Sequence, residues 1–116
     1  MSILQEINTI LDTLGIPVET GVFSDIAPDE YCVITPMVDN FGDYADNQPL
    51  YETQEVRISL YSKSNYVKRK NQIVKALLTN EITVTDRRYI GYENDTSYHH
   101  YAVDAAKEYF FTEEEV

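Results

Sequence analysis

Two adjacent histidines, His99 and His100, are the first place to look for chemistry, because imidazole is both a metal ligand and a general base near neutral pH. They are the only histidines in the chain. Neighbouring side chains point to opposite faces of a strand and lie about 100° apart on a helix, so the two rings could not bind one ion together. Zinc sites need three or four protein ligands, and Cys32 is the only thiol that could be added. We therefore expect exposed or interface histidines and no metal site.

Nucleophilic catalysis has no recognisable basis in this sequence either. Cys32 lies within the apolar stretch YCVITPMV, where a free thiol usually behaves as a small buried hydrophobe. No serine stands in a G-x-S-x-G motif, and the four glycines form no phosphate-binding loop. We predict a protein without enzymatic activity and without a cofactor; a small enzyme of unknown type is the alternative.

Three aspartates, Asp39, Asp43 and Asp46, fall in the polar stretch DNFGDYADNQPLY, residues 39–51. Carboxylates are the ligands that calcium prefers, but these three do not have the spacing of the twelve-residue calcium loop, and its closing glutamate is missing. The Asp, Asn, Gly and Pro content predicts instead a long, solvated acidic loop. Loops of this length often have a function or become ordered on assembly.

Charge is divided unevenly along the chain, whose net charge is −11. Residues 1–56 contain eleven acids and no base, residues 57–88 eight bases and two acids, and residues 89–116 seven acids and one base. Copies of such a chain could attract one another head to tail, which favours rings or filaments. The alternative is a fold that intermixes the charges on a solvated surface. The overall acidity argues against tight wrapping of nucleic acid.

Five bases, Lys63, Lys68, Arg69, Lys70 and Lys75, cluster at a predicted helix. Contact with nucleic acid is one interpretation of such a cluster. Because the rest of the chain is acidic, a solvated helix face or a protein–protein contact is the favoured interpretation. Ten tyrosines suit half-buried strands, and a few of them could anchor an interface.

Hydrophobic periodicity predicts a helix at each of two places. The first begins with a capping box of Ser2 and Gln5 and ends before Gly15 and Pro17. The second covers residues 65–80 after a cap at Ser62 or Ser64. Strands are predicted at residues 31–38, 52–62, 82–93 and 98–111, after a short extended piece at 16–23. Pro36 cannot donate to a ladder, so it predicts a sheet edge or a bulge.

The last of these strands conflicts with intrinsic propensity, because AVDAAKEY contains strong helix formers. The turn at residues 94–97 and the flanking aromatics favour a strand that closes a hairpin. The predicted fold class is α+β: an antiparallel sheet of about four strands packed by two helices, in the order α-β-β-α-β-β, with a long loop between the first two sheet strands. We expect one domain over residues 1–116 with an acidic tail at 113–116, and neither a signal peptide nor a membrane span.

Two stretches carry a resemblance to a known family. APDEYCVITPMVD resembles the first strand of the tail-completion and tail-terminator proteins of long-tailed bacteriophages, and YETQEVRISLYSKSNYVKRKNQIVKALL looks like their middle part. In those proteins a polar loop leads to an alternating strand, an aromatic–Ser–Lys turn and a helix of basic and apolar residues. The Ile/Leu-rich first helix and the aromatic last strand also fit, so the resemblance covers most of the chain.

The resemblance implies a virion protein, assembled in the host cytoplasm, that forms a homo-oligomeric and commonly hexameric ring at the head–tail junction. Such a ring ends the tail tube, joins it to the head connector proteins and lets double-stranded DNA pass without specific binding. The family has no catalytic residues to carry over. Its loop between the first two sheet strands faces neighbours or the channel, which here implies that Asp39, Asp43 and Asp46 repel DNA phosphates.

In this picture the bases Arg57, Lys68, Arg69 and Lys70 of one copy would meet an acidic surface of the next. Exposed pairs contribute only about 0–1 kcal/mol each, so apolar and tyrosine contacts would supply the affinity. Two alternatives remain. One is a neck or head-completion protein of the same junction, and the other is a free acidic protein that mimics DNA and inhibits a nuclease.

Overall fold

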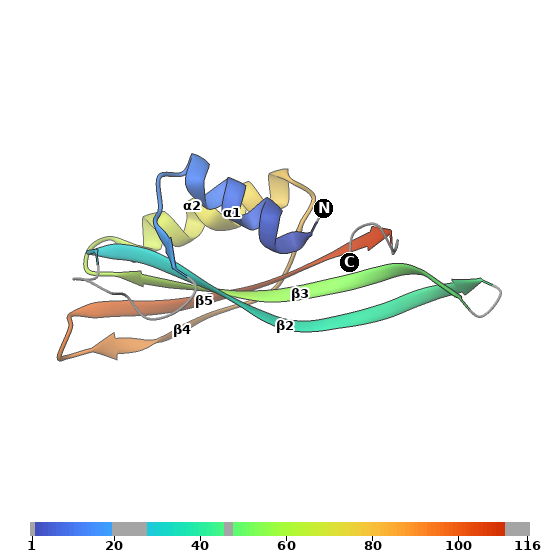
Figure 1. Cartoon of the computed structure of the whole chain (residues 1–116). Coiled ribbons are helices and arrows are strands. Elements are labelled where there is room, and N and C mark those ends of the chain that lie inside the picture. Colours follow the sequence, from blue (N-terminus) through green and yellow to red (C-terminus); the bar gives the residue numbers. More distant parts are fainter. Residues whose placement is uncertain (1, 20–27, 46–47, 111–116) are drawn as a thin grey trace.

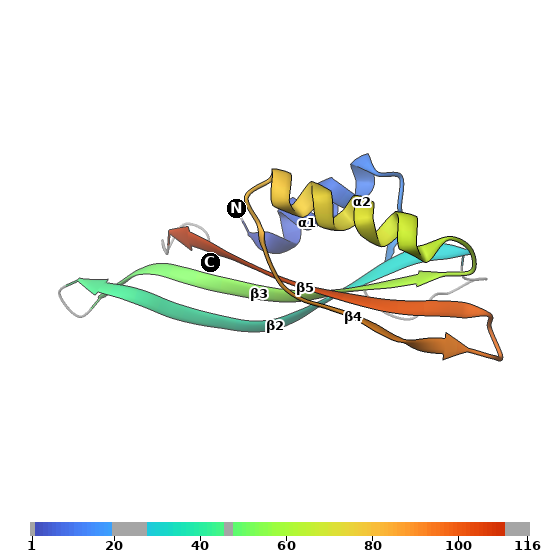
Figure 2. The same cartoon turned by 180° about the vertical axis from the view of Figure 1, so that it is seen from behind.

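The computed structural model describes residues 2–19, 28–45 and 48–110. The elements are α1 (Ile3–Thr13), β1 (Val18–Glu19), β2 (Glu30–Ala45), β3 (Gln48–Ser62), α2 (Tyr66–Thr79), β4 (Thr83–Glu93) and β5 (Tyr98–Phe110). Five strands form one sheet in the order β1-β2-β3-β5-β4. Both helices pack on the same face of this sheet (Figures 1 and 2).

The α+β class and the two helices are confirmed, and the prediction of a wholly antiparallel sheet of about four strands is wrong. The sheet is mixed, because β1 pairs in parallel with β2 through Val18 and Cys32. A parallel pair cannot be joined by a two-residue hairpin turn, and residues 20–29 separate β1 from β2. The other three pairings are antiparallel.

The first helix follows the sequence prediction closely. Ser2 and Gln5 form a reciprocal capping box, which satisfies two amide groups that the helix start would otherwise leave free. Gly15, at φ +74°, provides the left-handed residue that ends the helix region. The second helix is capped by the Asn65 side chain, which accepts from Lys68 N. The predicted caps are wrong, since Ser62 is fully buried in β3 and Ser64 precedes the cap.

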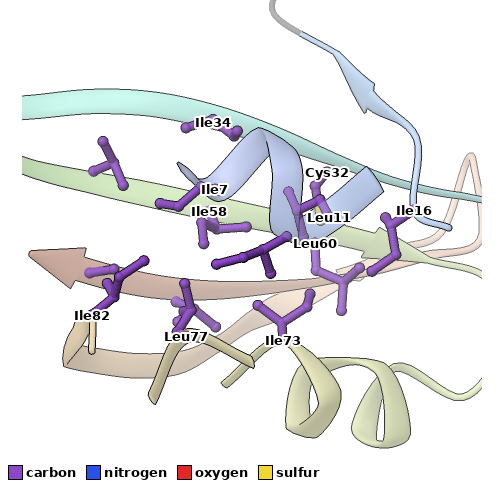
Figure 3. Packing of buried hydrophobic residues seen from close by; sticks show 14 of the residues in the cluster. Ile7, Leu11, Ile16, Cys32, Ile34, Ile58, Leu60, Ile73, Leu77 and Ile82 are labelled. Atoms are coloured by element: carbon purple, nitrogen blue, oxygen red, sulfur yellow. The ribbon is translucent and has the colours of Figure 1, made fainter. Parts of the chain in front are cut away.

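The core lies between the helices and the sheet (Figure 3). Fully buried side chains come from both helices and from the central strands, among them Ile7, Leu11, Ile58, Leu60 and Leu77. Their spacing, four residues apart on a helix and two on a strand, is what a helix layer on a sheet requires. Cys32 is part of this cluster, as the sequence predicts.

The predicted long loop at residues 39–51 is wrong. In the structure β2 and β3 continue as one antiparallel hairpin, with pairs running from Glu30–Ser62 to Ala45–Gln48. The Asp, Asn and Gly content misled the prediction, because continuous ladder pairing with β3 satisfies the backbone along this stretch and outweighs local turn propensity. The register shifts between Pro36 and Val38, which confirms the predicted bulge.

Residues 98–110 form a strand, so the prediction made against helix propensity is confirmed. β5 lies between β3 and β4, and its segment from Tyr98 to Ala106 is largely buried. A central place in the sheet gives a strand two ladder partners, and that tertiary context outweighs the helix propensity of the alanines. The predicted acidic tail at 113–116 lies outside the described residues.

Candidate functional site

The molecule is elongated, at 54 × 28 × 24 Å, and the β2–β3 hairpin accounts for one of its ends. The hairpin runs past the helices and past the end of β5 (Figures 1 and 2). We call residues 37–45 and 48–55 the arm. The amide of Ile3, at the start of α1, donates to Gln54 Oε1 at 2.9 Å, so the helix layer meets the sheet near the base of the arm.

The arm exposes large apolar side chains. Met37, Val38, Phe41 and Leu50 are 43–50% exposed, and Phe110, which packs on Tyr51 with ring centroids 4.8 Å apart, is 67% exposed. Single exposed apolar residues are common on protein surfaces, but a group of this size on one projection is typical of an interaction site. Phe41 and Leu50 were not predicted as site residues because residues 39–51 were expected to form a loop, and Met37, Val38 and Phe110 were expected in strands without a role.

The arm is acidic as well as apolar. Residues 37–55 contain five acids and no base. Of the predicted aspartates, Asp39 is exposed in β2 and Asp43 lies further along the same strand. Asp46 lies outside the described residues. The structure therefore places two of the three predicted aspartates on a projecting hairpin.

The described part of β2 also has a free edge along the arm. β1 pairs with β2 only at Cys32 and Val33, and β3 occupies the other side of β2. An unpaired strand edge is a template for another chain, and proteins usually cover or interrupt it. Pro36 and the adjoining bulge interrupt this edge between the body of the sheet and the arm.

The predicted interface bases do not form one surface. Arg57 lies on the sheet face opposite the helices, where its guanidinium makes two hydrogen bonds to the buried Asp104, at 2.8 and 3.1 Å. Lys68, Arg69 and Lys70 lie on α2. The three helix residues are thus separated from Arg57 by the sheet.

Three of the four predicted interface bases make contacts within the chain. Arg57 compensates the charge of Asp104, as above. Arg69 donates to Glu30 Oε1 at 2.7 Å and to the Leu14 carbonyl at 3.1 Å, which ties α2 to β2 and to the end of α1. Lys70 lies over the ring of Tyr101 at 4.9 Å, a cation–π contact. Lys68 is exposed, so it is the member of the set most accessible to a partner.

The outward surface of α2 combines apolar and basic side chains. Val67 is 45% exposed and Leu78 is 58% exposed. They lie outside the buried side of the helix, which is formed by Ile73 and Leu77. Residues 63–80 contain five bases and no acid. An acidic apolar arm and a basic apolar helix surface thus occur on one chain.

The two histidines lie in β5 and have different surroundings. Tyr89 Oη lies 3.0 Å from His99 Nδ1, and the rings of Tyr66 and Tyr92 are each 4.9 Å from that of His99. His100 stacks on Tyr61 with centroids 4.3 Å apart. Because they alternate along a strand, the rings face opposite sides of the sheet, and they do not form one site.

His100 is the less ordinary of the two. Its Nε2 is buried and has no hydrogen-bond partner among the described residues. Burial lowers the pKa of His100, a nearby Glu93 raises it and Arg57 lowers it, with a net shift below the usual value. The imidazole is therefore held neutral, because its charged form would be poorly solvated here.

Cys32, the one thiol in the chain, is buried and is not activated as a nucleophile. Burial, aided by the charge of Glu30, raises the pKa of the Cys32 thiol to about 12, which leaves no thiolate near neutral pH. Among the residues described, no three His, Cys, Asp or Glu side chains stand together so that they could hold a metal ion. Neither α1 nor α2, the helices of the described chain, has the length and apolarity needed to cross a membrane.

Comparison with protein-family models gives no match, and comparison with curated proteins gives no significant relative.

Proposed function

We propose that this chain is a non-enzymatic assembly subunit of a long-tailed phage or prophage virion. It forms a ring with copies of itself at the head–tail junction, ends the tail tube, joins it to the head connector and leaves a passage for DNA. One observation carries the assembly part of this proposal: the arm exposes a group of apolar side chains beyond the helix layer. Surfaces of this kind are normally covered in a complex.

The place at the head–tail junction rests on the resemblance in sequence described above. The order of elements is compatible with it, since two helices cover one face of the sheet. The segregation of acidic and basic residues along the chain also supports the proposal. A ring is built from heterologous contacts, in which one surface of a subunit meets a different surface of the next, and opposite charges suit such a pair of surfaces.

Solution mass is the first test of this proposal. Light scattering after size exclusion is expected to give a ring-sized species, and negative-stain microscopy is expected to show closed rings. Purified tail tubes from a terminator-deficient phage should then acquire a cap at one end when the protein is added. A protein that neither assembles alone nor binds tube ends would overturn the proposal. Binding to connector particles instead of tube ends would identify the neck protein of the same junction.

The acidic charge supports one candidate of another class, a free DNA mimic that inhibits a nuclease. A mimic needs a continuous acidic surface. The α2 surface interrupts it with exposed Lys68 and Lys75. A monomer that binds a DNA enzyme with a strong salt dependence would favour this candidate over the ring.

The arm aspartates have a proposed role in the ring as well. If the arm faces the channel, Asp39, Asp43 and Asp46 repel DNA phosphates and keep the duplex mobile. The triple Asp→Asn variant should still assemble, because exposed charge pairs contribute only about 0–1 kcal/mol each, and it should slow DNA release, as measured by DNA ejection from reconstituted particles. Normal release by that variant would count against a channel role, and a failure to assemble would place the aspartates at a subunit contact instead.

A further inference from the structure

The arm cannot be a self-sufficient unit. Beyond the Tyr51–Phe110 pair, β3 has β2 as its only strand partner in the described chain. Two-stranded hairpins are marginally stable in water unless another surface packs on them. The exposed apolar side chains of the arm therefore need a covering surface, and α1 does not extend far enough to provide it (Figure 1).

One face of the arm continues the face of the sheet that the helices cover. Glu52 and Gln54 lie four and two residues before the buried Val56 of β3, so they share its face, and their partners across the hairpin are Phe41 and Asp39. Alternation therefore puts Asp39, Phe41, Leu50 and Glu52 on the helix-covered side of the sheet. We call these four residues the arm face. It has two apolar side chains and two carboxylates.

The helix α2 carries a matching stripe. Residues 67, 71, 75 and 78 fall on one side of a helix of 3.6 residues per turn, with 68 at its margin. All five are exposed, and they are Val67, Lys68, Asn71, Lys75 and Leu78. This stripe lies away from the buried residues Ile73 and Leu77. We call it the α2 stripe, and it has two apolar side chains and two lysines.

We infer that copies of this chain join head to tail, with the arm face of one copy packed on the α2 stripe of the next. Apolar residues would meet apolar residues, and Asp39 and Glu52 would lie near Lys68 and Lys75. The wider segments support the match, because residues 37–55 carry five acids and no base while residues 63–80 carry five bases and no acid. In this contact α2 is covered by its own sheet on one side and by the neighbour's arm on the other.

The two surfaces are at different places on one molecule, which determines the kind of assembly. The arm extends away from the helices, so it cannot fold back onto the stripe of its own chain (Figure 2). A contact between two different surfaces is heterologous, and each copy can take part in two of them. This inference rests on the self-assembly in the proposed function, and it is independent of the location in the virion.

Cross-linking between two single-cysteine variants tests the contact directly. Asp39→Cys places a thiol on the arm face and Lys75→Cys places one on the α2 stripe, while native Cys32 is buried and does not compete. With a short bis-maleimide, an equimolar mixture should give covalent dimers of one variant with the other. Each variant alone should stay uncross-linked, since neither has a thiol on both sides of the contact. Cross-linking of Asp39→Cys to itself would indicate a two-fold contact and overturn the inference.

A charge-reversal series gives a second, independent readout. Lys68→Glu with Lys75→Glu should weaken association by up to about fivefold for each exposed pair lost. Adding Asp39→Lys and Glu52→Lys to the same chain should restore it. The control is Lys63→Glu, compared with Lys75→Glu alone, since Lys63 is an exposed base outside the stripe. Equal weakening by the control, or no restoration, would overturn the inference.

The two proposals fail in different ways. Native rings without any mixed cross-link would mean that copies join through other surfaces, and the proposed function would stand. A native chain that stays monomeric at every concentration would overturn the head-to-tail contact, and the mixture with tail tubes would then decide the proposed function separately.

Discussion

At the scale of single residues, the partly buried His100 should make stability depend on pH. Its pKa in the folded protein lies below the ordinary value near 6.5, so the unfolded chain takes up the proton first as pH falls. The free energy of unfolding should therefore decrease as pH falls through and below that value. His100→Phe retains a ring against Tyr61 and removes the titrating group, so this part of the pH dependence should disappear. Urea unfolding of the native protein and of His100→Phe, each at pH 7.5 and 5.5, measures this pH dependence.

The matched control for that experiment is His99→Phe, which removes the neighbouring imidazole from the other face of the same strand. If His99→Phe, and not His100→Phe, abolished the decrease in stability at low pH, the buried Nε2 would not be its source.

A second residue-scale prediction concerns the ion pair of Arg57 with Asp104. The side chain of Asp104 is 11% exposed and that of Arg57 is 36% exposed, so the carboxylate is largely buried. Arg57→Met should destabilise the protein by about 2 kcal/mol, because it leaves a buried charge with its hydrogen bonds lost. Adding Asp104→Asn should recover part of that loss, since the charge is then gone. Denaturant unfolding of the single and the double variant measures these changes. A double variant less stable than Arg57→Met would show that Arg57 does not act by compensating the buried charge of Asp104.

At the scale of elements, sequence patterns correctly predicted the features that arise from local residue spacing. The capping box of Ser2, the apolar stripes of both helices and the alternation of β3 all follow from spacing, and all are found. The pairing of Val18 with Cys32 was not predictable in the same way, because a two-residue strand has too few positions to show a period. The arm was misread because ladder pairing, which depends on the partner strand, outweighed local turn propensity.

The candidate site was predicted less well than the fold, for a related reason. A cluster of bases in the sequence says nothing of intramolecular partners, so Arg57 and Arg69 were assigned to an interface although both pair within the chain. Exposed Phe41 and Leu50 could be recognised only once the hairpin was known to extend beyond the helices. Charge segregation, by contrast, is a property of sequence position and needed no fold.

Shortening the arm tests whether this element serves assembly or stability. Asp39 and Gln54 are direct partners, so residues 40–53 can be replaced by Asn-Gly, the favoured turn for a two-residue hairpin. The core residues lie outside this segment. We expect a folded protein, with a modest loss from unpairing the end of β5, and no assembly. Circular dichroism against temperature and light scattering measure the two effects. Native-sized assemblies of the shortened chain would show that the arm is dispensable.

At the scale of the whole molecule, assembly should respond to salt only in part. Charges across an exposed contact are screened as the Debye length falls from about 10 Å at 0.1 M to about 3 Å at 1 M ionic strength. Apolar contacts through residues such as Phe41 and Leu78 persist at high salt. The association constant from light scattering should therefore fall as salt is raised and then reach a plateau at which the protein still associates. Insensitivity to salt would remove the electrostatic part of the contact. Complete dissociation at 1 M would mean that the exposed apolar side chains of the arm and of α2 do not meet one another, because screening alone leaves their burial intact.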